Sequence, residues 1–122
     1  MTRINCIPVG ELSNAHALSE YRELPRIRHL KPERHKGKLP PTYRMGRGHQ
    51  LFFLDKGRYL MRRHRELIAR LLELRYNLTV PALDLSHWPE WAMGDWVPDE
   101  AAMAISRGRI NERILQNTRI AK

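Results

Sequence analysis

Apolar residues recur with a helical period in three stretches of the chain, and the first of them follows a capping signal. Ser13 and Asn14 favour the start of a helix, and the stretch AHALSEYREL comes directly after them. Its apolar residues at helical spacing are expected to face the core: Leu18, Tyr21 and Leu24. The opposite face is polar and carries His16, Ser19, Arg22, Glu23 and Arg26. Pro25 is expected to kink this helix or end it.

The longest pattern covers KGRYLMRRHRELIARLLELRY, which begins after Asp55 and ends near Tyr76. Its main stripe consists of Leu60, Leu67, Leu71 and Leu74, with Met61, Ile68 and Leu72 beside it. This spacing predicts an amphipathic helix that buries the stripe in the core. The arginines of the same stretch are expected to form a solvated outer face: Arg62, Arg63, Arg65, Arg70 and Arg75.

The third pattern is expected to start at Pro98, because proline is favoured in the first turn of a helix. Asp99 and Glu100 follow it and suit the positive end of the helix dipole. The pattern continues through AAMAISRGRINERILQN. One side of this helix carries Met103, Ile110 and Ile114, and another carries Ala102, Ser106, Arg109 and Arg113.

The two stretches between these helices lack a regular period. Residues 28–50, RHLKPERHKGKLPPTYRMGRGHQ, form a basic stretch in which prolines and glycines argue against regular structure. Residues 86–96, SHWPEWAMGDW, form a second loop with three tryptophans. We expect Trp96 to pack in the core, and Trp88 and Trp91 are open to either core or surface. The fold class expected is all-α, with residues 1–122 forming a single compact domain of three main helices with long connecting loops.

Composition favours a small soluble protein. The chain has 122 residues and is 42% apolar, and no stretch approaches the roughly 20 apolar residues of a membrane span. The first residues, MTRINCIPVG, lack a basic region followed by a long apolar run, so we expect no signal peptide. Cys6 is the single cysteine, which excludes an internal disulfide and fits a reducing cytoplasm. We expect Cys6 to be a small buried apolar residue.

Charge is what first points to a partner. Twenty-two basic residues face 13 acidic ones, giving a net charge of +9, and 17 of the 22 are arginine. Arginine binds phosphate through a planar fork, whereas lysine acts as a point charge. The excess therefore favours a polyanionic partner, most simply nucleic acid. A generally basic surface, or association with the ribosome, is compatible with the same composition.

Common catalytic and metal-binding motifs do not occur. The chain has no GxxxxGK[ST], CxxC or HExxH, and no Ser-His-Asp pattern can be recognised. The stretch MGRGH contains GxG but lacks the strand and helix of a nucleotide site. His29 and His35 lie in a basic stretch without further ligands, so we expect no metal site there.

The N-terminus offers a candidate nucleophile. Threonine is a small second residue, so removal of Met1 is expected and would leave Thr2 with a free α-amine. Such an amine has an ordinary pKa of about 7.7–8, against about 10.4 for lysine, and Arg3 beside it would lower it further. A neutral amine can attack an electrophilic sugar carbon and form an imine. Many chains begin with Met-Thr without using the amine, and the polar face around Glu23 could simply be solvated.

Seven motifs, in order along most of the chain, make this sequence similar to one known family. They are MTRIN (1–5), SEYRELPR (19–26), PTY (41–43), GRGH (46–49), FFLDK (52–56), GDWVPDEAAMAIS (94–106) and RINERI (109–114). The sequence resembles the pyrimidine-dimer DNA glycosylase/AP lyase family, whose best-known member is the phage endonuclease V. The resemblance implies an all-α domain with the N-terminal segment packed among the helices.

The resemblance also implies a reaction and its residues. The α-amine of Thr2 would attack C1′ of a damaged nucleotide, release the base and leave a covalent imine. Glu23 would be the essential carboxylate for base release and for the β-elimination that cuts the strand. No metal or other cofactor is implied. The residues matched to DNA contacts are Arg3, His16, Arg22, Arg26 and Arg109, with Arg113 where the phage enzyme has a lysine.

We therefore expect a DNA repair enzyme, a monomer in the cytoplasm of a bacterium or virus-infected cell, whose partner is damaged double-stranded DNA. Its substrate would be the 5′ pyrimidine of a UV-induced cyclobutane dimer. Two departures from the phage enzyme leave alternatives open: the loop after the first helix is shorter, and no aromatic residue follows Trp96. The same imine chemistry on another damaged base is one alternative, and a non-catalytic nucleic-acid-binding protein is the other.

Overall fold

The fold is taken from a computed structural model, which describes residues 3–120 and, in the last helix, side chains as far as residue 112. Four α-helices occur in this range: α1 (Asn14–Glu23), α2 (His49–Phe52), α3 (Gly57–Glu73) and α4 (Glu100–Ile120). Four 3₁₀ helices accompany them: η1 (Val9–Glu11), η2 (Leu24–His29), η3 (Pro32–Arg34) and η4 (Glu90–Ala92). Among the described residues there is no strand, only one isolated bridge between Lys56 and Met93. The expectation of an all-α fold with three main helices is confirmed.

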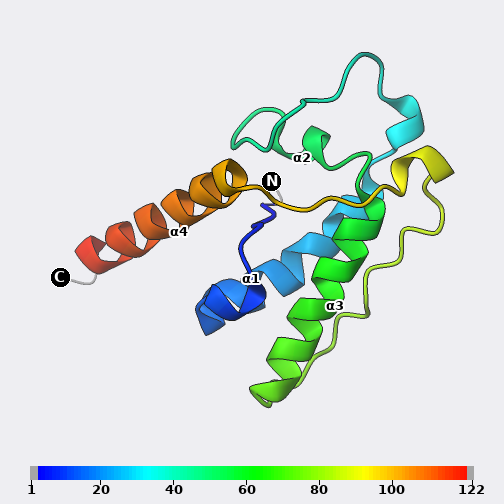
Figure 1. Cartoon of the computed structure of the whole chain (residues 1–122). Helices are drawn as coiled ribbons and strands as arrows, with labels where there is room; N and C mark the ends of the chain where they lie inside the picture. The colour runs from blue at the N-terminus through cyan, green and yellow to red at the C-terminus, as the bar shows by residue number, and fades with distance from the viewer. Residues whose placement is uncertain (1–2, 121–122) are drawn as a thin grey trace.

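The helices α1 and α3 pack against each other and form the body of the protein (Figure 1). The N-terminal segment runs between this pair and the first turns of α4, whose later turns extend away from the body (Figure 1). The long loop between η2 and α2 lies at the opposite end of α3 from its C-terminus (Figure 1). No described helix is both long and apolar enough to cross a bilayer.

The first helix has the predicted boundaries. The hydroxyl of Ser13 accepts the backbone N–H of His16 at 3.1 Å, which caps the start of α1. The helix ends at Glu23, and Pro25 lies in the 3₁₀ turn that follows. Tyr21 and Leu24 are buried, as expected from their spacing.

The second predicted helix corresponds to α3 and corrects one expectation. Three leucines of its stripe are fully buried, and the helix ends where Arg75 takes a left-handed conformation with φ 64°. Arg63, however, is not part of a solvated face: its residue is only 3% exposed. It lies at the edge of the stripe that faces α1, where its Nε forms an ion pair with the Glu20 carboxylate at 2.6 Å. A periodicity argument treats arginine as polar and so misses a charge neutralised by a partner on another helix.

The third predicted helix starts two residues later than expected. The Asp99 carboxylate accepts the backbone N–H of Ala102 at 2.8 Å and acts as the cap, so Pro98 precedes the helix. Ala102 and Ser106 are buried, and Met103 and Ile110 pack against the core. The side chains of Arg113 and Ile114 lie outside the described residues.

The connecting stretches are more ordered than their composition predicts. Within 28–50, the end of η2, the whole of η3 and the start of α2 interrupt an irregular path. Aromatic rings gather where α2 meets the start of α3, with centroid separations of 5.0–6.1 Å; they belong to Tyr43, Phe52, Phe53, Tyr59 and Trp96. Packing of Trp96 in the core is thus confirmed. Trp88 is 5% exposed and Trp91 is 56% exposed.

Two close approaches of backbone fix the segment before α4 against the start of α3. The N–H of Gly94 donates to the carbonyl of Asp55 at 3.1 Å, and the N–H of Arg58 donates to the carbonyl of Gly94 at 3.1 Å. A Cβ atom at Gly94 would lie 2.5 Å from the Asp55 carbonyl oxygen, so only glycine fits there.

Candidate active site

The N-terminal segment runs beside α1 in the opposite direction. Leu12 and Ser13 adjoin the start of α1, whereas Asn5 lies against Glu20 near its end, with its amide donating to the carboxylate at 2.7 Å. The segment from Ser13 back to Asn5 therefore runs from the start of α1 to Glu20, which lies three residues before the last residue of the helix, Glu23. Thr2, the predicted nucleophile, lies outside the described residues and directly precedes Arg3.

Ile4 is held by both of its backbone polar groups. Its N–H donates to Nε2 of His49 at 2.9 Å, and its carbonyl accepts the hydroxyl of Tyr43 at 2.8 Å. The residue is fully buried, with 0% exposure. Because a buried backbone group without a partner is costly, these two bonds fix where this part of the chain can lie.

Glu20 is the centre of a buried polar cluster. Its carboxylate accepts bonds from Arg63 Nε at 2.6 Å and Nη2 at 3.2 Å, and from the Asn5 amide at 2.7 Å. A further nitrogen of Arg63 donates to the carbonyl of Ile7. With Glu20 at 2% exposure and Arg63 at 3%, the pair joins α1, α3 and the N-terminal segment through charge-assisted bonds.

The last helix secures the same segment. The backbone N–H of Cys6 donates to the hydroxyl of Ser106 at 3.2 Å, across 100 residues of sequence. Cys6 itself is 3% exposed, as expected for a small buried residue, and burial raises the pKa of its thiol to about 11. Residues 4–7 are therefore anchored by α1, α3, α4 and the segment from Tyr43 to His49.

The predicted carboxylate and its flanking arginines come together where α1 ends. Glu23 is half-buried at the end of α1, Arg22 beside it is exposed, and Arg26 is exposed on η2. Arg3 is exposed at the start of the described chain, two residues from Asn5. This end of α1 thus carries a half-buried carboxylate with an exposed arginine on each side of it in sequence, and guanidinium groups are well suited to bind phosphates.

His16 belongs to the same helix face but makes a local contact. Its Nδ1 lies 2.8 Å from the hydroxyl of Ser13, which also caps the helix. The ring is half-buried. It lies seven residues before Glu23, close to two helical turns, so the two side chains project from the same side of α1.

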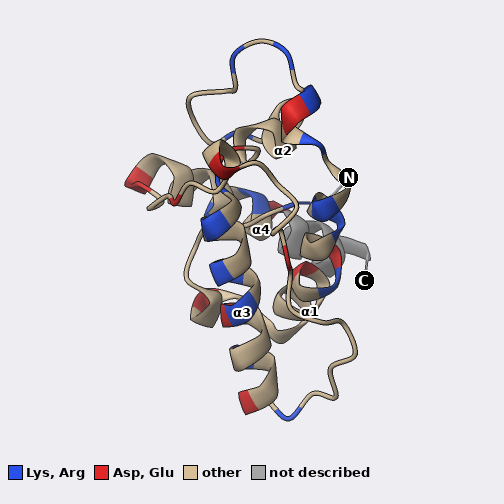
Figure 2. Cartoon of the chain, turned by 90° about the vertical axis from the view of Figure 1, so that its right-hand side faces the viewer, with Lys and Arg blue, Asp and Glu red and all other residues tan. Residues whose placement is uncertain are grey.

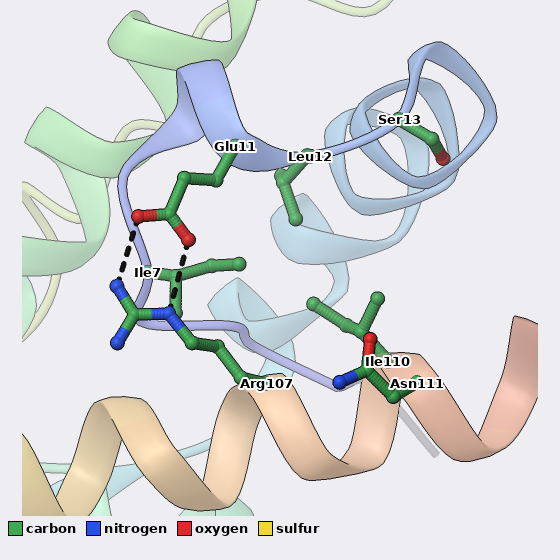
Figure 3. A pocket seen from close by; sticks show the side chains of 7 residues that line it. All are labelled: Ile7, Glu11, Leu12, Ser13, Arg107, Ile110 and Asn111. Atoms are coloured by element: carbon green, nitrogen blue, oxygen red, sulfur yellow. Dashed lines mark hydrogen bonds and ion pairs between the residues drawn. The ribbon is translucent and has the colours of Figure 1, made fainter.

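Arg109 lies on α4, one turn after the Ser106 that binds the N-terminal segment, and is half-buried. A second contact joins α4 to η1. The guanidinium of Arg107 donates two bonds to the carboxylate of Glu11, at 3.0 and 2.8 Å (Figure 3). This pair closes one side of a hollow of about 370 Å³ between η1 and α4, lined by Ile7, Glu11, Leu12, Ser13, Arg107, Ile110 and Asn111 (Figure 3).

Lys and Arg residues are also frequent along the long loop above α2 (Figure 2). The exposed cations from the last turn of η2 to the start of α2 are Arg28, Lys31, Arg34, Lys36, Lys38, Arg44 and Arg47. Glu33 is the one acidic residue of this stretch. Among the described residues, none of these seven cations forms an ion pair.

No model of a known protein family matches the chain. The site must therefore be interpreted from its geometry. Within residues 3–120 as described, no three side chains of His, Cys, Asp or Glu come close enough together to hold a metal ion. The site does offer a carboxylate and several guanidinium groups, and residues 4–7 beside it are firmly anchored.

Sequence reasoning predicted Glu23 and the arginines as site residues, which stays a prediction, and it missed the groups that anchor the segment. Tyr43 and His49 occur in the motifs PTY and GRGH, so a signal existed, yet nothing in those motifs assigns them a role. Asn5, Glu20 and Arg63 belong to three separate stretches, and only the fold brings them into contact.

Proposed function

We propose that the protein is a DNA glycosylase with AP lyase activity, acting on UV-damaged duplex DNA at the 5′ pyrimidine of a cyclobutane dimer. The proposed nucleophile is the α-amine of Thr2, exposed by removal of Met1. The carboxylate of Glu23 and the arginines around it complete the proposed site. The proposed setting is the cytoplasm, which suits a DNA substrate and a chain with a single thiol.

One observation carries the proposal: the described start of the chain is anchored at Ile4 and Asn5, and Asn5 is bound to Glu20, one helical turn before Glu23. The first residues of a chain are usually poorly ordered unless contacts hold them in place. Here α1, α3, α4 and the segment from Tyr43 to His49 all bind residues 4–7. A terminal amine that acts as a nucleophile does need such anchoring, since the reacting atoms must be held about 3–3.5 Å apart. The position of Asn5 near the end of α1 also supports a role for Glu23 beside that amine.

The proposed reaction has two steps. The neutral amine of Thr2 attacks C1′, the bond from C1′ to the base breaks, and the base departs with the electron pair and takes up a proton. The amine nitrogen gives up one proton, the bond from C1′ to O4′ breaks as O4′ takes up a proton, and a protonated imine forms between the nitrogen and C1′ of the opened sugar. A base then removes a proton from C2′, the bond from C3′ to the phosphate oxygen breaks, and the strand is cut.

Glu23 suits both steps as proposed. While ionised, a carboxylate can stabilise the positive charge that develops on the sugar as the base departs. It can also accept the C2′ proton in the elimination, as a general base. Arg3, Arg22, Arg26 and Arg109, with Arg113, are the groups proposed to bind the DNA backbone, with His16 near the sugar. Access to C1′ would require the nucleotide to leave the stack, which implies bending of the duplex.

The direct test adds one residue before Thr2, so that the proposed nucleophile is enclosed in a peptide bond. We expect this variant to lose imine formation with an abasic duplex while its affinity for the duplex changes less than threefold. Cleavage of duplexes with a thymine dimer, an abasic site and other damaged bases would then identify the lesion. Undiminished strand cleavage by the extended variant would refute the mechanism, and binding without any covalent adduct in the wild type would favour a non-catalytic nucleic-acid-binding protein.

A further inference from the structure

The segment from Tyr43 to His49 has no function in the reaction as described so far, yet it forms hydrogen bonds with both backbone polar groups of Ile4. His49 Nε2 accepts the N–H of Ile4 at 2.9 Å, and the Tyr43 hydroxyl donates to its carbonyl at 2.8 Å. These contacts join residues 45 and 39 positions apart in sequence. All three residues are buried, with exposures of 0%, 1% and 4% for Ile4, His49 and Tyr43.

The contacts define the state of the His49 ring. The backbone N–H of Ile4 can only donate, so Nε2 must carry a lone pair. The carbonyl of Arg44 can only accept, and it lies 2.7 Å from Nδ1, so Nδ1 carries the proton. The ring is therefore neutral and has one tautomer. Burial lowers the pKa of His49, which is consistent with a neutral ring.

The ring has little freedom to move. Its centroid lies 5.4 Å from that of Tyr43 and 5.7 Å from that of Phe53, both in edge-to-face contact. The bond from Nδ1 to Arg44 closes a turn that contains Gly46 and Gly48, both with positive φ. The acceptor offered to Ile4 is thus fixed by packing on both sides and by the turn.

We propose that His49 and Tyr43 are positioning residues that hold the start of the chain so that the Thr2 amine meets the sugar carbon. This inference rests on the proposed function. Thr2 stands two residues before Ile4, a distance of at most about 7 Å along the backbone, so a shift at Ile4 is passed on to the amine. A misplacement of about 1 Å can lower the rate of such a reaction about 100-fold.

Two substitutions at one position separate positioning from simple packing. In His49→Gln, the amide oxygen offers Ile4 an acceptor near the place of Nε2. In His49→Met, a side chain of similar volume fills the site without a comparable acceptor. Tyr43→Phe removes the second bond and keeps the ring.

His64 supplies a matched control. It is also buried, with 0% exposure, and it also bridges two backbone groups, the N–H of Leu83 at 2.9 Å and the carbonyl of Tyr21 at 2.9 Å. His64→Met thus loses the same kind of bridge and should destabilise the fold to a similar degree. Neither of these two hydrogen bonds of His64 involves residues 3–7.

The experiment measures the rate of borohydride trapping on an abasic duplex, per folded molecule, and the affinity for a duplex with a stable tetrahydrofuran abasic analogue. We expect His49→Met to trap about 100-fold more slowly and Tyr43→Phe about tenfold, with affinity within threefold of wild type. His49→Gln should recover at least tenfold of the loss, and His64→Met should trap within threefold of wild type.

A trapping rate for His49→Met that equals wild type, or that His64→Met matches, would overturn the positioning role and leave the proposed function intact. Equal loss in the Gln and Met variants would overturn it as well, because an acceptor at this position would then be irrelevant. A wild-type protein that forms no adduct would overturn both this inference and the proposed function. If His49→Met does not fold, Tyr43→Phe still decides: trapping about tenfold more slowly than wild type supports the positioning role, and trapping at the wild-type rate overturns it.

Discussion

Glu20 and Glu23 lie one turn apart on α1, and their surroundings suit them to different tasks. Glu20 is 2% exposed and is fully engaged by Arg63 and Asn5. Glu23 is half-buried at the end of the helix, where Arg22 and Arg26 are exposed. The first carboxylate is therefore suited to holding the fold together, and the second to the chemistry that we propose.

Replacing Glu23 tests that division. We expect Glu23→Gln to slow strand cleavage at an abasic site by about 100- to 10,000-fold, because a general base contributes about this much. Affinity for the duplex should stay within about threefold, since the change is isosteric. Cleavage would be followed on a labelled abasic duplex, with the exposed Glu33→Gln as control. A variant that cleaves within a few-fold of wild type would exclude Glu23 as the essential carboxylate.

Two adjacent arginines on α3 allow a second comparison at this scale. Arg63 forms the buried pair with Glu20, whereas Arg62 pairs with Asp95 at 2.7 Å with both side chains more than 40% exposed. We expect Arg63→Met to lower the free energy of unfolding by about 3–5 kcal/mol, because it leaves a buried carboxylate without its partner. Arg62→Met should cost about 0–1 kcal/mol. Urea unfolding of both variants would check this, and equal losses would contradict the assignment of Arg63 to the core.

At the scale of elements, two buried imidazoles connect parts of the chain that no helix connects. His49 bridges Ile4 to Arg44, and His64 bridges Leu83 to the carbonyl of Tyr21. Each ring must stay neutral to accept a backbone N–H. Burial lowers the pKa of both rings below the ordinary value of 6.5.

Because the pKa values of His49 and His64 are lowered, the free energy of unfolding is expected to fall as the pH falls. Above pH 6.5 both rings are neutral in the folded and the unfolded chain, so their contribution to stability is fully present. As pH falls below 6.5, the unfolded chain takes up protons that the folded protein does not, and stability is lost until the lower folded pKa is reached. The loss should approach about 1.4 kcal/mol per pH unit for each ring. Urea unfolding at pH 7.5 and 5.5 would measure it.

The double variant His49→Gln/His64→Gln is the control for this effect. Glutamine does not titrate, so the loss of stability between the two pH values should shrink by the contribution of both rings. An identical pH dependence in wild type and double variant would show that the two histidines are not responsible for it.

How far the sequence predicts these elements depends on whether the signal is local. Ser13 and Pro25 fixed the boundaries of α1 because caps and breakers act within a few residues. The four residues of α2 are too few to show a period, and Arg63 was misassigned because its partner lies 43 residues away. The anchoring of Ile4 by His49 is equally non-local, so the sequence could name Glu23 as a candidate but could not predict what holds the N-terminal segment in place.

At the scale of the whole molecule, the net charge of +9 leads to a prediction about DNA affinity. Each phosphate contact releases counterions, so the logarithm of the affinity falls with the logarithm of salt with a slope of about −0.9 per contact. If Arg22 and Arg26 bind phosphates, Arg22→Gln/Arg26→Gln should make this slope shallower by about 2. Fluorescence anisotropy on an undamaged duplex across a series of NaCl concentrations would measure it.

A matched charge change keeps this test specific. Arg58 and Arg65 are exposed on α3 and project from the side away from its buried stripe. Arg58→Gln/Arg65→Gln removes the same two charges, and we expect it to change the slope by less than about 0.5. Equal changes in both variants would mean that net charge alone sets the affinity and that the end of α1 is not the DNA-binding face.

The proposed nucleophile is the central claim of the account. The anchored segment would position the Thr2 amine, and the basic surface would bind the DNA that carries the sugar. The most direct measurement is borohydride trapping on an abasic duplex, followed by mass spectrometry of the intact protein and of the cross-linked peptide. We expect a protein that lacks Met1 and a covalent adduct on the α-amine of Thr2. An adduct on a lysine such as Lys56, or no adduct with either abasic or UV-irradiated duplex, would contradict the account.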